Sequence, residues 1–213
     1  MKKAFTLVEM LLVIVVFGVG ILTVLYGITQ TLRIQDSTEM MIDSSFFARE
    51  GIELMYALRD ANYAKSQPRN CVFKDVNIEN TTTLNQKDEK NPYCSAFFTG
   101  GDVLKLSLPP KDDSTYIVAS VGPALTDFET NFNNYQLVYC IGVSDFYYGY
   151  SGDNVDNKNC QTTRYARYIL IKSLKDGQTI LPSDNILKIE SHVLYRKGGF
   201  TGESIMESFI GNY

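Results

Sequence analysis

The sequence predicts an α+β protein in which a long N-terminal helix packs by its second half against an antiparallel β-sheet head. No proline interrupts residues 5–67, so nothing in that stretch forces a helix to break. Apolar residues recur there at helical spacings, whereas short alternating runs separated by turn residues follow Pro68. The 213 residues leave room for one globular unit of ordinary size plus an appendage.

Composition narrows the classes of function. The 20 Lys and Arg residues and 24 Asp and Glu residues give a net charge of −4, which argues against a nucleic-acid-binding surface. A single histidine leaves little material for metal or nucleophilic sites, so we expect no catalytic residue, no metal and no cofactor. The four cysteines permit two disulfides.

A membrane-length segment lies close to the start of the chain. No charged side chain occurs among the 23 residues from Met10 to Leu32. As a helix they span about 34 Å, enough to cross a hydrocarbon core of about 30 Å. Lys2 and Lys3 should stay in the cytoplasm, because positive residues beside a first span set its orientation. The rest of the chain is then exported.

A cleaved secretory signal is the alternative explanation of this segment, and two features count against it. The apolar run exceeds the roughly 7–15 residues of such a signal, and Glu9 stands at its start, where a plain signal has no use for it. A carboxylate there costs on the order of 1–3 kcal/mol in insertion, so we expect it to have a partner. Cutting the chain before Phe5 would create one, since the new amino group would lie four residues from Glu9 on the same helical face.

The residues at this boundary resemble those of a known family. The segment reads Lys2-Lys3-Ala4, then Phe5-Thr6-Leu7-Val8-Glu9, then an aliphatic run that begins Met10-Leu11-Leu12. This pattern strongly resembles the class III leader and N-methylation site of type IV pilins and pseudopilins. The resemblance implies that a prepilin peptidase cuts between Ala4 and Phe5 and methylates the Phe5 amine, and that Glu9 guides docking onto a neighbouring subunit. The family generally has glycine where this chain has Ala4, which should slow cleavage.

The resemblance also implies partners and a location. Copies of the chain and other pilins would form a helical filament at the cell surface, built by an inner-membrane platform and its ATPase. Before assembly, the subunit would be a single-pass protein of the cytoplasmic membrane with its head outside the cytoplasm. The motif covers only the start of the chain, so it specifies the assembly pathway and not what the head does.

The helical pattern continues after the span. One apolar stripe holds Met41, Ala48, Ile52 and Met55, and a second stripe beside it holds Phe47, Gly51, Leu54 and Leu58. Arg49 and Glu53 should form an ion pair on the other side, worth a few tenths of a kcal/mol. A helix from Phe5 to Tyr63 would be about 88 Å long against about 40 Å for the head, so half of it would protrude, as in the lollipop outline of pilins.

The expected divisions are a leader at 1–4, a transmembrane and filament-core helix at 5–32, the amphipathic half of that helix at 33–63, and an exported head at 64–213. Gly18, Gly20 and Gly27 lie in the spanning half, where each lowers helix stability by about 1 kcal/mol relative to alanine. Close helix packing is one explanation. Our second hypothesis is that residues 18–27 partly unwind when the subunit leaves the bilayer.

The head is predicted to be an antiparallel sheet with long loops. The expected strands are 103–108, 116–121, 136–143, 165–174 and 186–195. In the last strand, alternation places Lys188, Glu190 and His192 on a face that we expect to be solvated. Residues 175–185 should connect the last two strands as a loose hairpin, and Gly198-Gly199 should turn the chain into its final segment.

Four cysteines, Cys71, Cys94, Cys140 and Cys160, lie in the exported region. An oxidising compartment and the absence of C-x-x-C spacing favour disulfides over zinc. Three pairings are possible. We favour Cys71 with Cys94 and Cys140 with Cys160, because each would close one loop-rich insertion and stabilise by about 3 kcal/mol.

Weaker candidates in the head have plainer explanations. His192 is interpreted as a surface residue rather than a catalytic base, and Gly149-Tyr150-Ser151-Gly152 as a turn rather than a nucleophile elbow. The loop at 153–157 is rich in oxygen ligands but lacks EF-hand spacing for Ca²⁺, and Asn80-Thr81-Thr82 matches a glycosylation triplet. The aromatic run Phe146, Tyr147, Tyr148 and Tyr150 either packs on the head or anchors a contact. Arg164, Arg167 and Lys172 form a modest basic set.

We therefore predict a structural subunit of a type IV pilus, major or minor and adhesive, serving adhesion, twitching motility or DNA uptake, and not itself an enzyme. A pseudopilin of a type II secretion or competence system shares the whole N-terminal argument. An alternative of another class is a membrane-anchored receptor or enzyme that never polymerises, which predicts an uncut leader.

Overall fold

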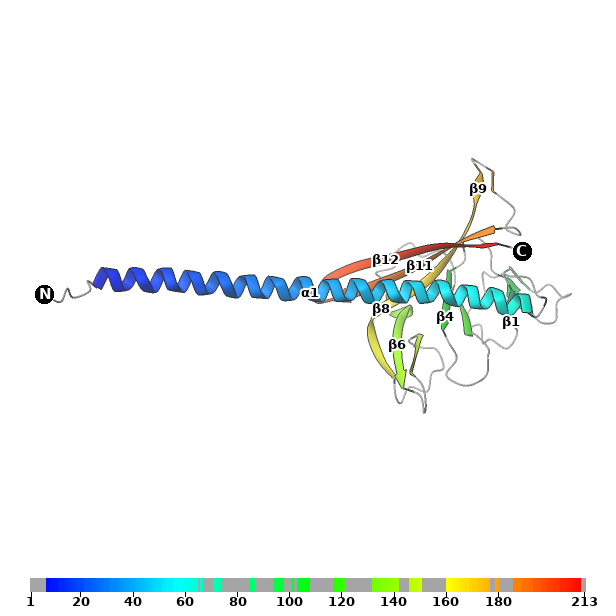
Figure 1. Ribbon diagram of the computed structural model, residues 1–213. Coiled ribbons are helices and arrows are strands. Elements are labelled where there is room, and N and C mark those ends of the chain that lie inside the picture. Colours follow the sequence, from blue (N-terminus) through cyan, green and yellow to red (C-terminus); the bar gives the residue numbers. More distant parts are fainter. Residues whose placement is uncertain are drawn as a thin grey trace. The chain divides into compact units, whose positions relative to one another are not determined.

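The computed structural model describes residues 7–64, 66, 71–73, 85–86, 94–97, 101, 103–107, 117–121, 132–141, 146–150, 160–176, 179–180 and 186–211 (Figure 1). The chain divides into two compact units, Met1–Ile42 and Asp43–Tyr213. One continuous helix, α1 (Leu7–Ala64), runs through both and agrees with the predicted helix 5–63.

The described part of the first unit is entirely helical. Its large apolar side chains from Leu7 to Ile34 are each 47% to 77% exposed. The helix continues through Gly18, Gly20 and Gly27, and a Cβ built on any of these three would meet nothing within 4 Å. Among the described residues, nothing packs closely on these three glycines.

The second unit is built on an antiparallel sheet of seven strands. They are β4 (Val103–Ser107), β5 (Ile117–Val121), β6 (Gln136–Ile141), β7 (Phe146–Tyr150), β8 (Cys160–Ser173), β11 (Ile186–Lys197) and β12 (Phe200–Gly211). Their order is β12-β11-β8-β4-β5, and β6 pairs with both β7 and β8. A short 3-10 helix, η1 (Phe132–Asn134), precedes β6.

Two smaller sheets accompany the main one. The first joins β1 (Cys71–Phe73), β3 (Cys94–Phe97) and β2 (Asn85–Gln86) in that order. The second pairs β9 (Lys175–Asp176) with β10 (Thr179–Ile180). In the sequence this second sheet falls between β8 and β11, which are neighbours in the main sheet, and this confirms the predicted hairpin between these two strands.

All five predicted strands are present, as β4, β5, β6, β8 and β11. β8 begins at Cys160, five residues before the predicted start at 165, because its first residues pair with β6. The final segment is a full strand, β12, that pairs with β11 along its whole length. The turn between them is at Gly198 and Gly199, whose φ angles of 54° and 83° suit the tight hairpin turn that glycine favours.

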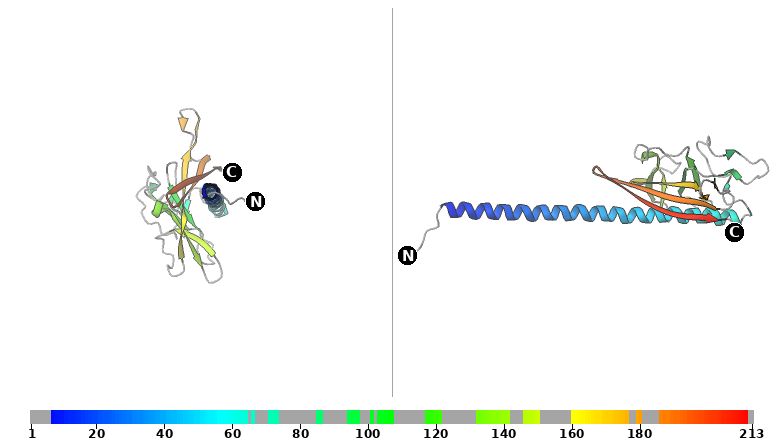
Figure 2. Two further views of the ribbon diagram at one scale, coloured as in Figure 1. Left: turned by 90° about the vertical axis from the view of Figure 1, so that its left-hand side faces the viewer. Right: turned by 90° about the horizontal axis from the view of Figure 1, so that it is seen from above.

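The part of α1 in the second unit packs on one face of this sheet, alongside β11 and β12 (Figures 1 and 2). Ala48, Ile52 and Met55 are buried as the helical spacing predicted, whereas Met41 is 51% exposed. Ile52 and Met55 belong to a core cluster that also includes Ile169 of β8. Burial of this cluster is the main apolar stabilisation of the unit.

Hydroxyl contacts at two positions join the helix to the edge strand β12. The hydroxyls of Ser44 and Ser204 are 2.5 Å apart, and the Tyr56 hydroxyl contacts that of Ser208. Since the two contacts lie twelve residues apart on the helix, they fix β12 along three turns of α1.

A second apolar cluster covers the opposite face of the sheet. It consists of Val103, Phe132, Tyr135, Ala166, Tyr168 and Leu194. β8 therefore contributes to a core on each side, which explains its continuous run of buried residues from Tyr165 to Ile169.

Candidate functional site

The first candidate site is the amino-terminal end of α1. Among the described residues, α1 is the single helix long and apolar enough to cross a membrane. Glu9 lies in its first turn, where the helix dipole favours a negative charge, between the exposed side chains of Val8 and Met10. The predicted processing residues Ala4 and Phe5 lie outside the described residues.

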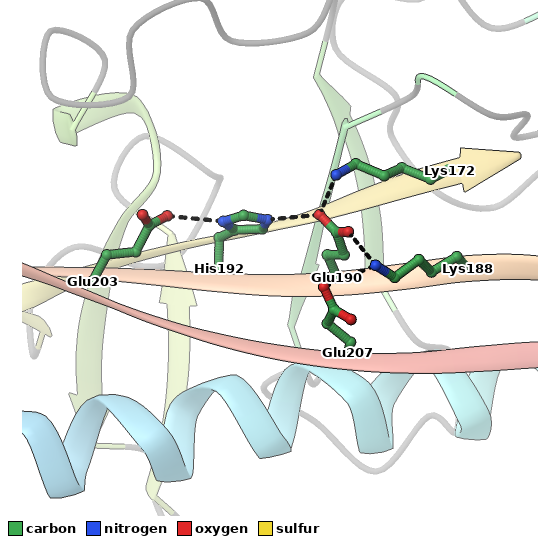
Figure 3. Close-up of polar contacts among 6 residues, drawn as sticks. All are labelled: Lys172, Lys188, Glu190, His192, Glu203 and Glu207. Atoms are coloured by element: carbon green, nitrogen blue, oxygen red, sulfur yellow. Dashed lines mark hydrogen bonds and ion pairs between the residues drawn. The ribbon is translucent and has the colours of Figure 1, made fainter. Parts of the chain in front are cut away.

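A second candidate is a polar cluster on the sheet face that points away from α1 (Figure 3). It joins Lys172, Lys188, Glu190, His192, Glu203 and Glu207. Glu190 is its centre, with Lys172 Nζ at 2.6 Å, Lys188 Nζ at 2.8 Å and His192 Nε2 at 3.2 Å from its carboxylate oxygens. Burial alone would raise the pKa of the Glu190 carboxyl, but these three hydrogen bonds outweigh it and lower the pKa to about 2.

His192 links this centre to the edge strand. Its Nδ1 lies 2.8 Å from Glu203 on β12, and its ring stacks on that of Tyr168 with centroids 4.6 Å apart. Because both ring nitrogens face carboxylate oxygens, only the doubly protonated ring can donate to both at once. Apart from the histidine, the cluster holds two lysines against three glutamates.

The expectation of a solvated face and a surface histidine is wrong. Glu190 and His192 are only 4% and 9% exposed, because Tyr168 and side chains of the neighbouring strands cover them. His192 contacts the carboxylates of Glu190 and Glu203 and stacks on Tyr168, and these contacts connect β8, β11 and β12. Within the part of the chain that the structure describes, no group of three or more His, Cys, Asp or Glu side chains could hold a metal ion.

Arg167 is a buried residue that the sequence analysis grouped with Arg164 and Lys172 as a basic set. It is fully buried, whereas Arg164 is exposed and Lys172 pairs with Glu190, so the three do not form one basic surface. Its guanidinium donates to the carbonyl oxygens of Leu106 at 2.8 Å and Phe47 at 3.1 Å.

Two side chains keep the buried Arg167 charged. Its Nη1 lies 3.3 Å from Glu50, and its Nε donates to the Tyr150 hydroxyl at 3.4 Å. Burial would lower the pKa of Arg167, but Tyr150 and Glu50 outweigh it and raise the pKa. A signal for this site was present, because Arg167 alternates with Tyr165 and Ile169 on the inward face of β8.

The contact between Arg167 and Tyr150 also shows how one residue of the aromatic run is used. Tyr150 is buried, so it packs in the head and does not anchor a surface contact. Gly149 and Tyr150 belong to strand β7 rather than to a turn. Ser151, Gly152, the loop at 153–157 and the triplet at 80–82 lie outside the described residues, as do the side chains of residues 146–148.

Comparison with known proteins bears on the N-terminal site alone. Residues 1–25 match the prokaryotic N-terminal methylation motif. The leader is type IV pilin-like. This motif ends within the membrane-length part of α1, so the head takes no assignment from it. The chain matches no curated protein and no solved structure.

Cys71 and Cys160 are both disulfide-bonded, and no described cysteine is free. Cys140 and Cys160 lie directly opposite each other in the register of β6 and β8, while Cys94 lies opposite Phe73, two residues from Cys71. This register agrees with the favoured pairings, which stay a prediction.

Proposed function

We propose that the chain is a structural subunit of a type IV pilin-like filament. It would be inserted as a membrane-anchored precursor, cut between Ala4 and Phe5, methylated at Phe5, and polymerised through its N-terminal helices. The supporting observation is a methylation motif continuous with a helix whose apolar side chains from Leu7 to Ile34 remain 47% to 77% exposed. Such a surface needs lipid before assembly and neighbouring helices after it.

In this proposal Glu9 is the assembly residue. A carboxylate at the membrane entrance is costly unless a cation faces it. The amine freed at Phe5 supplies that cation, either in the same chain or in a neighbour packed out of register. A prepilin peptidase and an assembly platform with its ATPase would act on the subunit, which does no chemistry of its own.

The exported head would reach the cell surface as part of a pilus that serves adhesion, twitching motility or DNA uptake. The disulfides Cys71–Cys94 and Cys140–Cys160 would close its loop-rich insertions. The same leader motif is used by pseudopilins, which form a short periplasmic fibre. Filaments sheared from cells and containing this chain favour the pilus, whereas retention in the periplasm favours the pseudopilin.

Mass spectrometry of the protein from its native host tests the proposal. We expect a mature chain that begins with N-methylated Phe5 and lacks the first four residues. A chain that retains Met1 would contradict processing and favour a membrane-anchored protein that never polymerises. A cut but unmethylated Phe5 would contradict only the methylation step.

A further inference from the structure

We propose that a cavity in the second unit binds an alkylammonium group. The cavity has a volume of about 410 Å³, within the range of small-ligand sites. Its lining consists of Asp43, Phe46, Phe47 and Glu50 from α1, Tyr139 from β6, and Thr163 and Tyr165 from β8.

The walls of this cavity are regular secondary structure. The four helical residues are spaced by three, four and seven positions, so they share one face of α1. The other wall comes from β6 and β8, which pair antiparallel with a bulge between Gln136 and Val138. Phe47 and Tyr165 join the two walls through rings whose centroids are 5.0 Å apart. The site is therefore formed before any ligand arrives, which lowers the entropy cost of binding.

The charge of the lining favours a cation. Asp43 accepts a hydrogen bond from the Tyr165 hydroxyl at 2.9 Å, and this neutral donor leaves its negative charge in place. Glu50 pairs with the buried Arg167 at 3.3 Å. Two carboxylates and one guanidinium give this neighbourhood a net charge of −1, so an anionic ligand would be repelled.

The hydroxyl protons of Thr163 and Tyr165 are already used within the protein. Thr163 donates its proton to the carbonyl oxygen of Leu137 at 2.7 Å, and Tyr165 donates to Asp43. These two residues therefore offer a ligand acceptor oxygens rather than donors. A group that brings its own N–H protons, or a full positive charge, matches this surface.

Aromatic rings distinguish an organic cation from a metal ion. Four of the seven described lining residues are aromatic, and Phe46 leaves 65% of its surface exposed. Ring faces attract ammonium groups and cover their alkyl carbons, whereas Mg²⁺ and Ca²⁺ require a shell of oxygen ligands. Carboxylates beside rings thus select an alkylammonium group.

Two sources could supply this group. One is a free amine, and the other is a lysine side chain of a second copy of this chain. The second source rests on the proposed function, because it requires polymerisation. The chemistry of the cavity is the same for both.

Titration of the full chain in micelles of an uncharged maltoside detergent tests the site. Choline, n-butylammonium and 3,3-dimethylbutan-1-ol, the uncharged isostere of choline, would be added while ring signals of labelled Phe and Tyr are followed by NMR. We expect saturable shifts with both cations, and binding of the isostere at least about tenfold weaker. Equal binding of choline and its isostere, or no saturable shift, would overturn the proposal.

Variants place the binding at this cavity. Asp43→Asn should weaken choline binding about tenfold and Phe46→Leu several-fold. Glu53→Gln is the matched control. It removes a carboxylate from the same helix, and the partner of that carboxylate is the exposed Arg49. An unchanged affinity in Asp43→Asn would contradict the site. The isostere comparison uses the unaltered chain, so it decides the question even where a variant folds poorly.

The same titration on sheared filaments separates the two sources. Filaments that no longer respond to choline indicate that a lysine of a neighbouring copy fills the cavity, whereas an unchanged response indicates a free amine. If the native chain proves to be uncut and monomeric, the proposed function fails while binding in micelles still stands. If choline does not bind in micelles but the native chain carries methylated Phe5, the cavity proposal fails and the proposed function stands. The two failures are therefore distinguishable.

Discussion

The two halves of α1 belong to one unbroken helix but differ in how their apolar side chains are covered. From Leu7 to Ile34 these side chains are 47% to 77% exposed, whereas Ala48, Met55 and Leu58 are at most 1% exposed. The second half finds its cover in the sheet of its own chain. The first half must obtain cover from lipid or from other helices, because so large an apolar surface is not stable in water. Stability of the head and assembly of the chain should therefore respond to different substitutions.

The largest expected effect is that of Glu9→Val on the first half. Removing the carboxylate makes the span more apolar, so membrane insertion should be unchanged or improved. Filament formation should be lost, because the amine freed at Phe5 then has no acidic partner. Filament yield after shearing and the amount of protein in the membrane fraction measure the two properties.

Glu39→Gln is the matched control for Glu9→Val, since Glu39 is an exposed residue of the same helix. We expect normal filaments from this variant. Normal filaments from Glu9→Val as well would remove the docking role from the proposed function. Neither substitution should change the unfolding of the head.

The second half is most sensitive at Arg167. Arg167→Met would leave Glu50 and the carbonyl oxygens of Leu106 and Phe47 without the guanidinium that they contact. Losing one partner of a buried charged pair costs about 3–5 kcal/mol. Urea unfolding of the full chain in uncharged micelles, followed by tyrosine circular dichroism, measures this loss.

Arg164→Met, three residues earlier on β8, removes an exposed charge and should change stability by no more than about 0.5 kcal/mol. Equal losses in the two variants would show that the buried network is not what stabilises the head.

Arg167 also shows how far the sequence could predict the fold. The helix and five strands followed from apolar periodicity and turn residues, because those patterns are local. The same alternation puts Arg167 on the inward face of β8, although we had expected it in a basic set with Arg164 and Lys172. Its partners could not be predicted, because Glu50, Leu106 and Tyr150 come from three other elements that only the folded chain brings together.

The N-terminal site and the polar cluster also differ in whether local sequence is enough to predict them. The leader motif is a contiguous run of residues, so Ala4, Phe5 and Glu9 could be identified without a fold. Glu190 and His192 looked solvated because β11 alone gives no sign of the side chains that cover them. Short pairings such as β1 with β3 join residues far apart in the sequence, which periodicity does not report.

The next effect is the acid sensitivity of the head, which we expect to depend on Glu190. Its pKa falls from an ordinary 4.5 to about 2, so its stabilising contribution is complete above about pH 4.5 and is lost as the pH falls toward 2. For this buried carboxylate the shift corresponds to on the order of 3 kcal/mol. Unfolding free energies between pH 6 and pH 2.5 should show the decline.

Glu190→Gln should be less stable than the unaltered chain at pH 6, because Lys172, Lys188 and His192 lose their shared carboxylate. Since other carboxylates also titrate in acid, the difference between the two chains is the quantity to follow. It should shrink as the pH falls below 4.5. A constant difference across this range would contradict the role of Glu190.

The smallest expected effect on stability is that of replacing a glycine by alanine, which can be compared in the two halves of α1 through Gly51→Ala and Gly27→Ala. A Cβ on Gly51 would collide with Ser191 Oγ, while a Cβ on Gly27 would meet nothing within 4 Å. We expect Gly51→Ala to lower the unfolding free energy by about 1–3 kcal/mol through overpacking, and Ser191→Ala to restore part of it in the double variant. Gly27→Ala should leave the head unchanged and add up to about 1 kcal/mol to the helix.

In a filament, Gly27→Ala should have a larger effect than Gly51→Ala if Gly27 lies against a neighbouring helix. A methyl group there would occupy space that the isolated chain leaves open. Gly27→Ala should then reduce filament yield while Gly51→Ala, once folded, assembles normally. Normal filaments from Gly27→Ala would instead indicate lipid or a loosely packed neighbour at this position. The pair thus separates the cover that the chain supplies to its own helix from the cover that it must obtain elsewhere.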